Sequence, residues 1–110
     1  MYRVDEDGTI EMIRGDTAEF DITVTVEEEG QIVPYILQEG DILTFTVKKS
    51  TKVEEVLIQK FGEHITINPD DTESLKYGGY KYDVQLTFAN GKVDTIIPPH
   101  NFILNEEVTW

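Results

Sequence analysis

Alternation of apolar and polar residues dominates the chain. In TAEFDITVTV, residues 17–26, every second residue from Phe20 to Val26 is apolar and the residues between them are Asp or Thr. The same period of two recurs in DILTFTVKK, residues 41–49, and in YKYDVQLTF, residues 80–88. A period of two is typical of a strand with one buried face. The pattern therefore predicts three long strands that share one core.

Shorter apolar runs predict the remaining strands of an antiparallel set. They are TIEMIR, EVLIQKF and HITI, at residues 9–14, 55–61 and 64–67. The segment NFILNEEVTW, residues 101–110, follows Pro98 and Pro99, which have no N–H group to donate to a neighbouring strand. We expect this segment to form a last strand or an edge segment.

Turn signals separate these runs. Asn90 and Gly91 lie between two alternating runs in FANGKVDTII. A type I′ turn needs positive φ at both central residues, and the Asn-Gly dipeptide tolerates this well, so we expect a type I′ hairpin here. The acidic clusters DEDG, residues 5–8, and EEEG, residues 27–30, predict exposed turns.

Helix is expected only as one short turn in DTESLKYG, with Asp71 or Thr72 as its cap and Gly78 or Gly79 at its end. The chain has 110 residues, which suits one domain with its own core. There is no internal repeat, low-complexity segment or linker. Residues 1–110 are therefore predicted to form a single β-sandwich domain.

One sequence motif makes the fold prediction more specific. In DTESLKYGGYKYDVQL, a turn with Leu75 precedes Tyr80 and Tyr82, which lead into a strand. This resembles the corner between strands E and F of immunoglobulin-like domains, where a Tyr hydroxyl bonds to the backbone upstream. Tyr80 matches this structural corner, and Tyr82 takes the place of a cysteine that this chain lacks. We expect an all-β, immunoglobulin-like antiparallel β-sandwich of seven to eight strands, with at most one short helical turn.

Charge and composition exclude several partners. Nine Lys and Arg oppose 22 Asp and Glu, which gives a net charge of −13. Such a surface repels phosphate backbones and anionic lipids, so we expect neither nucleic acid nor membrane as a partner. The start MYRVDEDG is polar and acidic, unlike a signal peptide. The absence of cysteine removes disulfides and thiol chemistry.

The sequence contains no catalytic or metal-binding pattern that we can identify. His64 and His100 lack the spacing of zinc ligands, and Ser50 and Ser74 lack the context of a catalytic nucleophile. The acidic run NPDDTES lacks the rhythm of a calcium loop. We therefore expect a protein that is not an enzyme and that binds no cofactor and no metal.

Arg14-Gly15-Asp16 raises the alternative of a cell-adhesion ligand. Such a ligand displays its Arg and Asp at the tip of an exposed loop. Here the tripeptide lies between the end of one predicted strand and the start of another, so a turn allowed by Gly15 is the simpler interpretation.

Partner contacts are expected near the C-terminus. The candidates are exposed apolar or rigid residues, namely Pro98, Pro99, Phe102 and Trp110. The alternative is that Val108 and Trp110 complete the core. The open edges of a sandwich offer a second route, because a strand of a neighbour can add there.

Three stretches together resemble a family: IRGDTAEFDITVT, LQEGDILTFTVKKS and YGGYKYDVQLTFANGKVDTIIP. They are similar to small β-sandwich structural proteins of phages and prophages of Gram-positive bacteria, in particular the N-terminal domain of phage baseplate upper proteins. The resemblance implies a phage structural or baseplate-associated protein without turnover. Its partners would be other phage structural proteins or further copies of itself. It would reside in the host cytoplasm during assembly and then in the virion.

A carbohydrate- or cell-surface-binding β-sandwich module is the alternative function. Such a module holds sugar rings by stacking them on exposed aromatic side chains. Tyr2, Tyr35, Tyr77 and Trp110 are the candidates, but the sequence places no two of them on one face of a strand.

Overall fold

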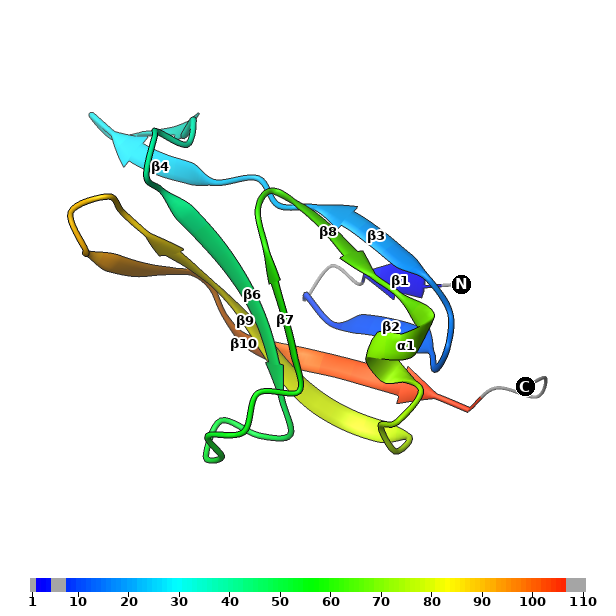
Figure 1. Ribbon diagram of the computed structural model, residues 1–110. Coiled ribbons are helices and arrows are strands. Elements are labelled where there is room, and N and C mark those ends of the chain that lie inside the picture. The colour runs from blue at the N-terminus through cyan, green and yellow to red at the C-terminus, as the bar shows by residue number, and fades with distance from the viewer. Residues whose placement is uncertain (1, 5–7, 107–110) are drawn as a thin grey trace.

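The computed structural model describes residues 2–4 and 8–106 (Figure 1). Strands dominate this part of the chain. The elements are β1 (Tyr2–Val4), β2 (Ile10–Ile13), β3 (Ala18–Asp21), β4 (Thr25–Glu28), β5 (Gln31–Pro34), β6 (Ile42–Lys48), β7 (Ile58–Phe61), β8 (His64–Ile67), α1 (Pro69–Thr72), β9 (Gly78–Thr87) and β10 (Val93–Asn105).

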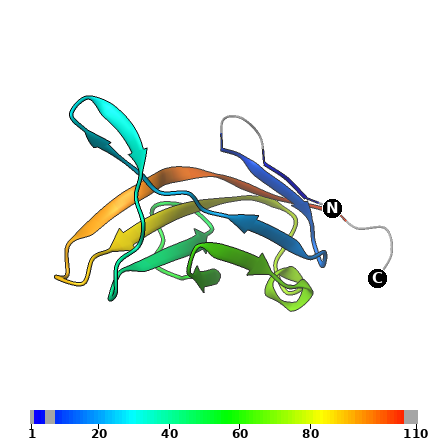
Figure 2. The same ribbon diagram turned by 90° about the horizontal axis from the view of Figure 1, so that it is seen from above.

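Six strands form a large curled sheet in the order β1-β2-β10-β9-β6-β7. Neighbouring strands are antiparallel, except that β10 runs parallel to β2. The pair β3-β8 forms a second sheet, which covers one face of the large sheet (Figure 2). The pair β4-β5 forms a third sheet on its own.

The core lies between the large sheet and β3-β8. Alternate residues of β6, from Leu43 to Val47, and of β9, from Tyr80 to Leu86, are buried on the inner face. Ile65 and Ile67 of β8 are fully buried opposite them. The period of two in the sequence is therefore the period of the buried face, because successive side chains of a strand point to opposite sides.

The all-β class, the sandwich-like layering and the single short helix are confirmed. Ten strands occur among the described residues, rather than seven or eight. One reason is that the predicted strand 17–26 divides into β3 and β4, with buried Ile22 and Val24 between them. The C-terminal strand is not an edge segment, because β10 lies between β2 and β9. A register shift between Ile97 and His100 accommodates the two prolines within β10.

The hairpin at Asn90 is confirmed, but its predicted turn type is wrong. Gly91 has φ of +91°. Among the described residues, Glu29 is the one non-glycine residue with positive φ. Asn90 therefore has negative φ, whereas a type I′ turn needs positive φ at both central residues. The Phe88 carbonyl accepts a hydrogen bond from Gly91 N–H at 2.9 Å, and Phe88 N–H donates to Lys92 at 2.8 Å. The loop therefore has three residues and ends in a left-handed glycine, the next most common solution for a tight hairpin.

The helical turn begins earlier than predicted. Asn68, rather than Asp71 or Thr72, is the N-cap of α1, and Pro69 occupies the first turn. Asp71 accepts a hydrogen bond from Asn68 N–H at 2.7 Å. Proline suits the first turn of a helix because its missing N–H has no intrahelical partner there.

The hairpin that does use a type I′-like turn joins β4 to β5. Its central residues Glu29 and Gly30 have φ of +52° and +79°. Because Asn enters the left-handed region more readily than Glu, Glu29→Asn should stabilise this hairpin by about 0.5–1 kcal/mol. Amide hydrogen exchange of β4 and β5 should slow about two- to fivefold at this free energy. The matched variant Glu28→Asn, placed in the strand, should not slow exchange; equal slowing in both variants would contradict the turn argument.

Candidate functional site

The most prominent surface feature is a projecting arm, which we define as residues 25–36. Its strands β4 and β5 pair with each other and with no other strand among the described residues. Figure 2 shows the arm standing away from the two layers of the body. An isolated two-stranded hairpin is at best marginally stable in water, so the arm depends on what holds its base and what covers its faces.

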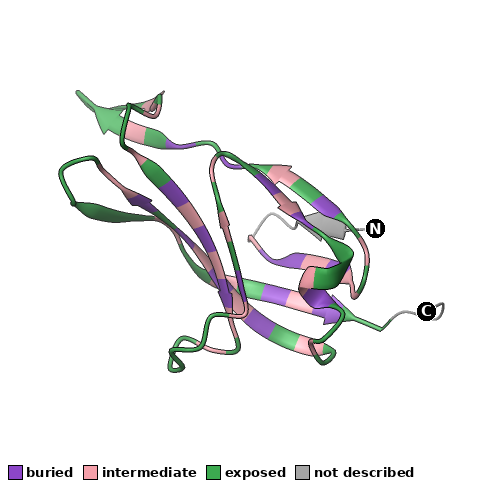
Figure 3. Cartoon of the chain, in the orientation of Figure 1, coloured by how far each residue is buried: buried purple, intermediate pink, exposed green. Residues whose placement is uncertain are grey.

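One face of the arm is an exposed apolar ridge, formed by Ile32, Pro34 and Ile36. These residues alternate along the chain, and Ile32 and Ile36 keep 75% and 77% of their surface exposed. The opposite face carries Val26 and Val33, which are half-buried and lie directly across from each other. Figure 3 shows the arm mostly in the colour of exposed residues. The apolar ridge is thus an unpartnered surface rather than part of the core.

The base of the arm is anchored by one carboxylate. Asp41 accepts hydrogen bonds from the Tyr35 hydroxyl at 2.7 Å and from the backbone N–H of Gln38 at 2.9 Å and of Ala89 at 3.3 Å. The Tyr35 bond is the largest cause that lowers the pKa of Asp41. The Tyr35 ring also packs edge-on against Phe88, with ring centroids 6.1 Å apart. The arm therefore projects from a fixed root beside the β9-β10 hairpin.

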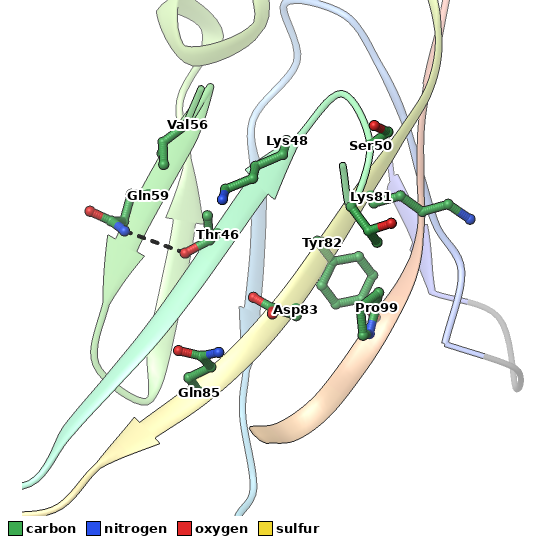
Figure 4. A pocket seen from close by; sticks show the side chains of 11 residues that line it. Thr46, Lys48, Ser50, Val56, Gln59, Lys81, Tyr82, Asp83, Gln85 and Pro99 are labelled. Atoms are coloured by element: carbon green, nitrogen blue, oxygen red, sulfur yellow. Dashed lines mark hydrogen bonds between the residues drawn. The ribbon is translucent and has the colours of Figure 1, made fainter. Parts of the chain in front are cut away.

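A second feature is a hollow of about 350 Å³ on the outer face of the large sheet. It lies over β6, β7 and β9, with Pro99 of β10 at its edge, beside the loop of residues 49–57 (Figure 4). Residues that line it include Thr46, Lys48, Val56, Gln59, Asp83 and Pro99. Gln59 donates a hydrogen bond to the Thr46 hydroxyl at 3.4 Å. The volume is at the lower end for a ligand site and suits a few side chains or one small molecule.

Charge in the hollow is mixed. Lys48 and Lys81 lie at its wall, and Lys81 donates to Asn101 at 2.5 Å on the side away from the hollow (Figure 4). Burial raises the pKa of Asp83, and the nearby Lys48 ammonium partly offsets this. The Lys48 ammonium and the Asp83 carboxylate therefore largely offset each other at the hollow.

The predicted contact residues are not brought together in one surface. Pro98 and Pro99 are exposed at the irregular part of β10. Phe102 is completely buried in the core, so its prediction as a partner contact is wrong. It pairs with Ile10 of β2 and Tyr80 of β9, which places it in the middle of the large sheet. Trp110 lies outside the described residues.

Tyr80 has the geometry of the predicted structural corner. Its side chain is only 4% exposed, and its hydroxyl donates to the carbonyl of Lys76, four residues upstream, at 2.6 Å. The Lys49 ammonium lies 4.6 Å from the centre of its ring. The hydroxyl thus fixes the turn that leads into β9.

Arg14-Gly15-Asp16 is a docked turn. The Arg14 guanidinium donates to the Leu75 carbonyl at 3.2 Å and lies 4.5 Å from the centre of the Tyr77 ring. Gly15 has φ of +86°, and its N–H donates to the hydroxyl of buried Thr72 at 2.9 Å. These contacts favour the turn interpretation over adhesion, because they tie the arginine to the body of the protein.

His64 is engaged in an exposed ion pair across β3 and β8. Its Nδ1 lies 2.7 Å from Asp21 and its Nε2 lies 3.8 Å from Glu19. The Asp21 hydrogen bond is the main cause that raises the pKa of His64 above its ordinary value of 6.5.

This pair predicts a pH dependence of the β3-β8 contact. The stabilisation is fully present below pH 6.5 and is lost as the pH rises through the raised pKa of His64. In an NMR titration, His64 should show a pKa above 6.5, and Asp21→Asn should return it toward that value. An unchanged pKa in Asp21→Asn would contradict the pairing.

The residues of the apolar ridge were not predicted from the sequence. The run QIVPYILQ alternates Ile32, Pro34 and Ile36 with half-buried Val33 and Tyr35, so the period of two was present. Alternation alone does not tell which face is covered. An apolar face that stays exposed therefore cannot be separated from a core face by this signal.

Residues 2–4 and 8–106 contain no group of metal ligands. In this part of the chain, no three His, Asp or Glu side chains gather as metal ligands do. Its one helix, α1, has four residues and cannot cross a bilayer. Comparison of the chain with known protein families, with curated proteins and with solved structures gives no match.

Proposed function

We propose that this chain is a non-enzymatic structural or baseplate-associated protein of a phage or prophage that acts through protein–protein contacts. The observation that carries the proposal is the arm, a hairpin that projects from the body with Ile32 and Ile36 exposed. Exposed apolar surface on a projecting segment is typical of an interaction site. The resemblance to phage β-sandwich proteins adds the setting, with assembly in the host cytoplasm and residence in the virion.

The carbohydrate-binding alternative receives less support from the side chains described. Tyr35 is engaged with Asp41 and Phe88 at the base of the arm. Tyr77 lies under Arg14 near α1. The hollow is lined mainly by aliphatic, hydroxyl, amide and charged groups, with Tyr82 nearly buried at its wall. A stacking platform for sugar rings needs exposed aromatic faces, so protein contacts are the better proposal.

Detection of the chain in purified particles tests this function. Particles from induced cultures of the encoding bacterium should contain the wild-type chain. The double variant Ile32→Ser/Ile36→Ser should reduce its incorporation by at least about tenfold, because central apolar anchors dominate such contacts. The matched variant Phe61→Ser, which removes an exposed apolar side chain from β7, should be incorporated normally. A wild-type chain absent from particles would overturn the proposal.

A further inference from the structure

We propose that the hollow on the outer face of the large sheet binds a free α-amino acid, whose carboxylate pairs with Lys48 and whose ammonium pairs with Asp83. This inference goes beyond the proposed function, because it assigns a ligand to a surface that the arm does not include. It uses the two charged side chains that face the hollow and the polar groups around them.

Strand register places the two charged side chains as diagonal neighbours on the outer face. Thr46 of β6 lies directly opposite Asp83 of β9, and Lys48 follows two residues after Thr46 on the same side of the strand. Diagonal neighbours of an antiparallel pair are roughly 7–8 Å apart, so a small molecule with two opposite charges can bridge them. Figure 4 shows both side chains beside Thr46 at the hollow.

Neither charged group has a partner that a ligand would need to displace. Among the described residues, the side chains of Lys48 and Asp83 form no salt bridge with each other and no hydrogen bond with a third residue. Burial raises the pKa of Asp83, and the Lys48 ammonium offsets this only in part. A half-buried carboxylate of this kind gains from a ligand that donates hydrogen bonds to it.

The Lys48 ammonium is the positive group that faces the hollow. Lys81 also lines the hollow, but its ammonium donates to Asn101 at 2.5 Å on the far side (Figure 4). The Lys49 ammonium donates to the Gly79 carbonyl at 3.2 Å. One ammonium and one carboxylate therefore face the hollow, and their charges cancel.

This balance of charge selects a ligand that is neutral overall but carries both charges. The net charge of −13 repels anions from the protein surface. A cation is attracted by Asp83 but repelled by Lys48. A zwitterion avoids both repulsions, since its carboxylate accepts hydrogen bonds from Lys48 while its ammonium donates them to Asp83. An α-amino acid is a small and common molecule of this kind.

The size and the lining of the hollow fit a small amino acid. Its volume of about 350 Å³ is at the lower end for a ligand site. Val56, which is 44% exposed, offers an apolar contact, so we expect a short aliphatic side chain such as that of valine. The hydroxyl and amide groups that can complete the hydrogen bonds of the ligand belong to Thr46, Ser50, Thr51, Gln59 and Gln85.

Titration with L-valine, followed by NMR through the backbone amides, tests the site. We expect the amides of residues 46–59 and 81–85 to shift and to saturate with a dissociation constant of about 1 mM or below. N-acetyl-L-valine amide carries neither charge and should bind at least about tenfold more weakly, because hydrogen bonds between charged groups are stronger than neutral ones.

Neutral variants test the two charged groups separately. Asp83→Asn and Lys48→Gln should each weaken the binding of L-valine by at least about tenfold. Asp94→Asn and Lys92→Gln make the same changes at exposed sites outside the hollow and should bind L-valine as the wild type does. Circular dichroism checks that each variant is folded.

Three results would each overturn the amino-acid site. They are a wild-type chain whose hollow amides do not shift up to about 20 mM L-valine, equal binding of N-acetyl-L-valine amide, and normal binding by Asp83→Asn and Lys48→Gln. The first result would mean that water alone fills the hollow. Incorporation into particles is measured without the ligand, so the proposed function can survive any of these results.

Discussion

Phe45→Ala should destabilise the domain by about 3–5 kcal/mol, a large share of the 5–15 kcal/mol typical of a domain. Phe45 is fully buried at the centre of β6. Its ring packs against Phe20 and Tyr82, with centroids 5.4 Å away in both cases. Truncation therefore removes apolar contacts between the large sheet and the β3-β8 layer, and it leaves a cavity that the neighbouring strands cannot fill. Urea unfolding measures the loss.

Phe61→Ala provides the matched control for this prediction. It is the same substitution on the adjacent strand β7, but Phe61 is 61% exposed. The control should change the free energy of unfolding by less than about 1 kcal/mol. Similar losses in both variants would contradict a core centred on Phe45.

Tyr80→Phe should destabilise the domain by about 1–3 kcal/mol, the second largest effect we expect. The substitution keeps the buried ring but removes the hydroxyl that donates to Lys76 at 2.6 Å. The Lys76 carbonyl then loses its partner in a partly buried position. The segment from Leu75 to Gly79, which orients the start of β9, should exchange its amides faster as well.

Tyr77→Phe is the control for the corner. Tyr77 belongs to the same turn but is 38% exposed, and its ring interacts with Arg14 through its face. Loss of its hydroxyl should leave stability nearly unchanged. A loss as large as that of Tyr80→Phe would mean that the turn, and not the corner hydrogen bond, determines the effect.

Much of the fold could be predicted because most long strands have one buried face. β6, β8 and β9 match their predicted segments closely, since alternation marks both the strand and its inner side. The corner at Tyr80 was predictable from a local motif whose hydrogen bond spans four residues. Features set by local chemistry were therefore accessible without the structure.

Features set by pairing between distant strands were not accessible. The parallel pairing of β10 with β2 places Phe102 in the core, and nothing near this residue in the sequence indicates it. Turn types also depend on the strands they connect. The left-handed turn predicted for Asn90 is formed instead at Glu29, where a two-residue loop joins β4 and β5 in register.

The candidate site was the least predictable part. The hollow combines residues from four strands and a loop, and most of its members are ordinary polar residues. The arm has the alternating apolar residues of a strand that packs on a core. The structure alone shows that the arm lies outside the two packed layers, so that Ile32 and Ile36 remain exposed. Neither feature carries a sequence motif. Partner contacts were therefore predicted at the apolar residues near the C-terminus instead.

The amount of this chain in purified particles tests the central claim, that the arm is a contact surface, most directly. We expect particles from induced cultures of the encoding bacterium to contain the wild-type chain. We expect at least about tenfold less of Ile32→Ser/Ile36→Ser, whereas Phe61→Ser should match the wild type. Equal incorporation of the double variant and the wild type would contradict the claim.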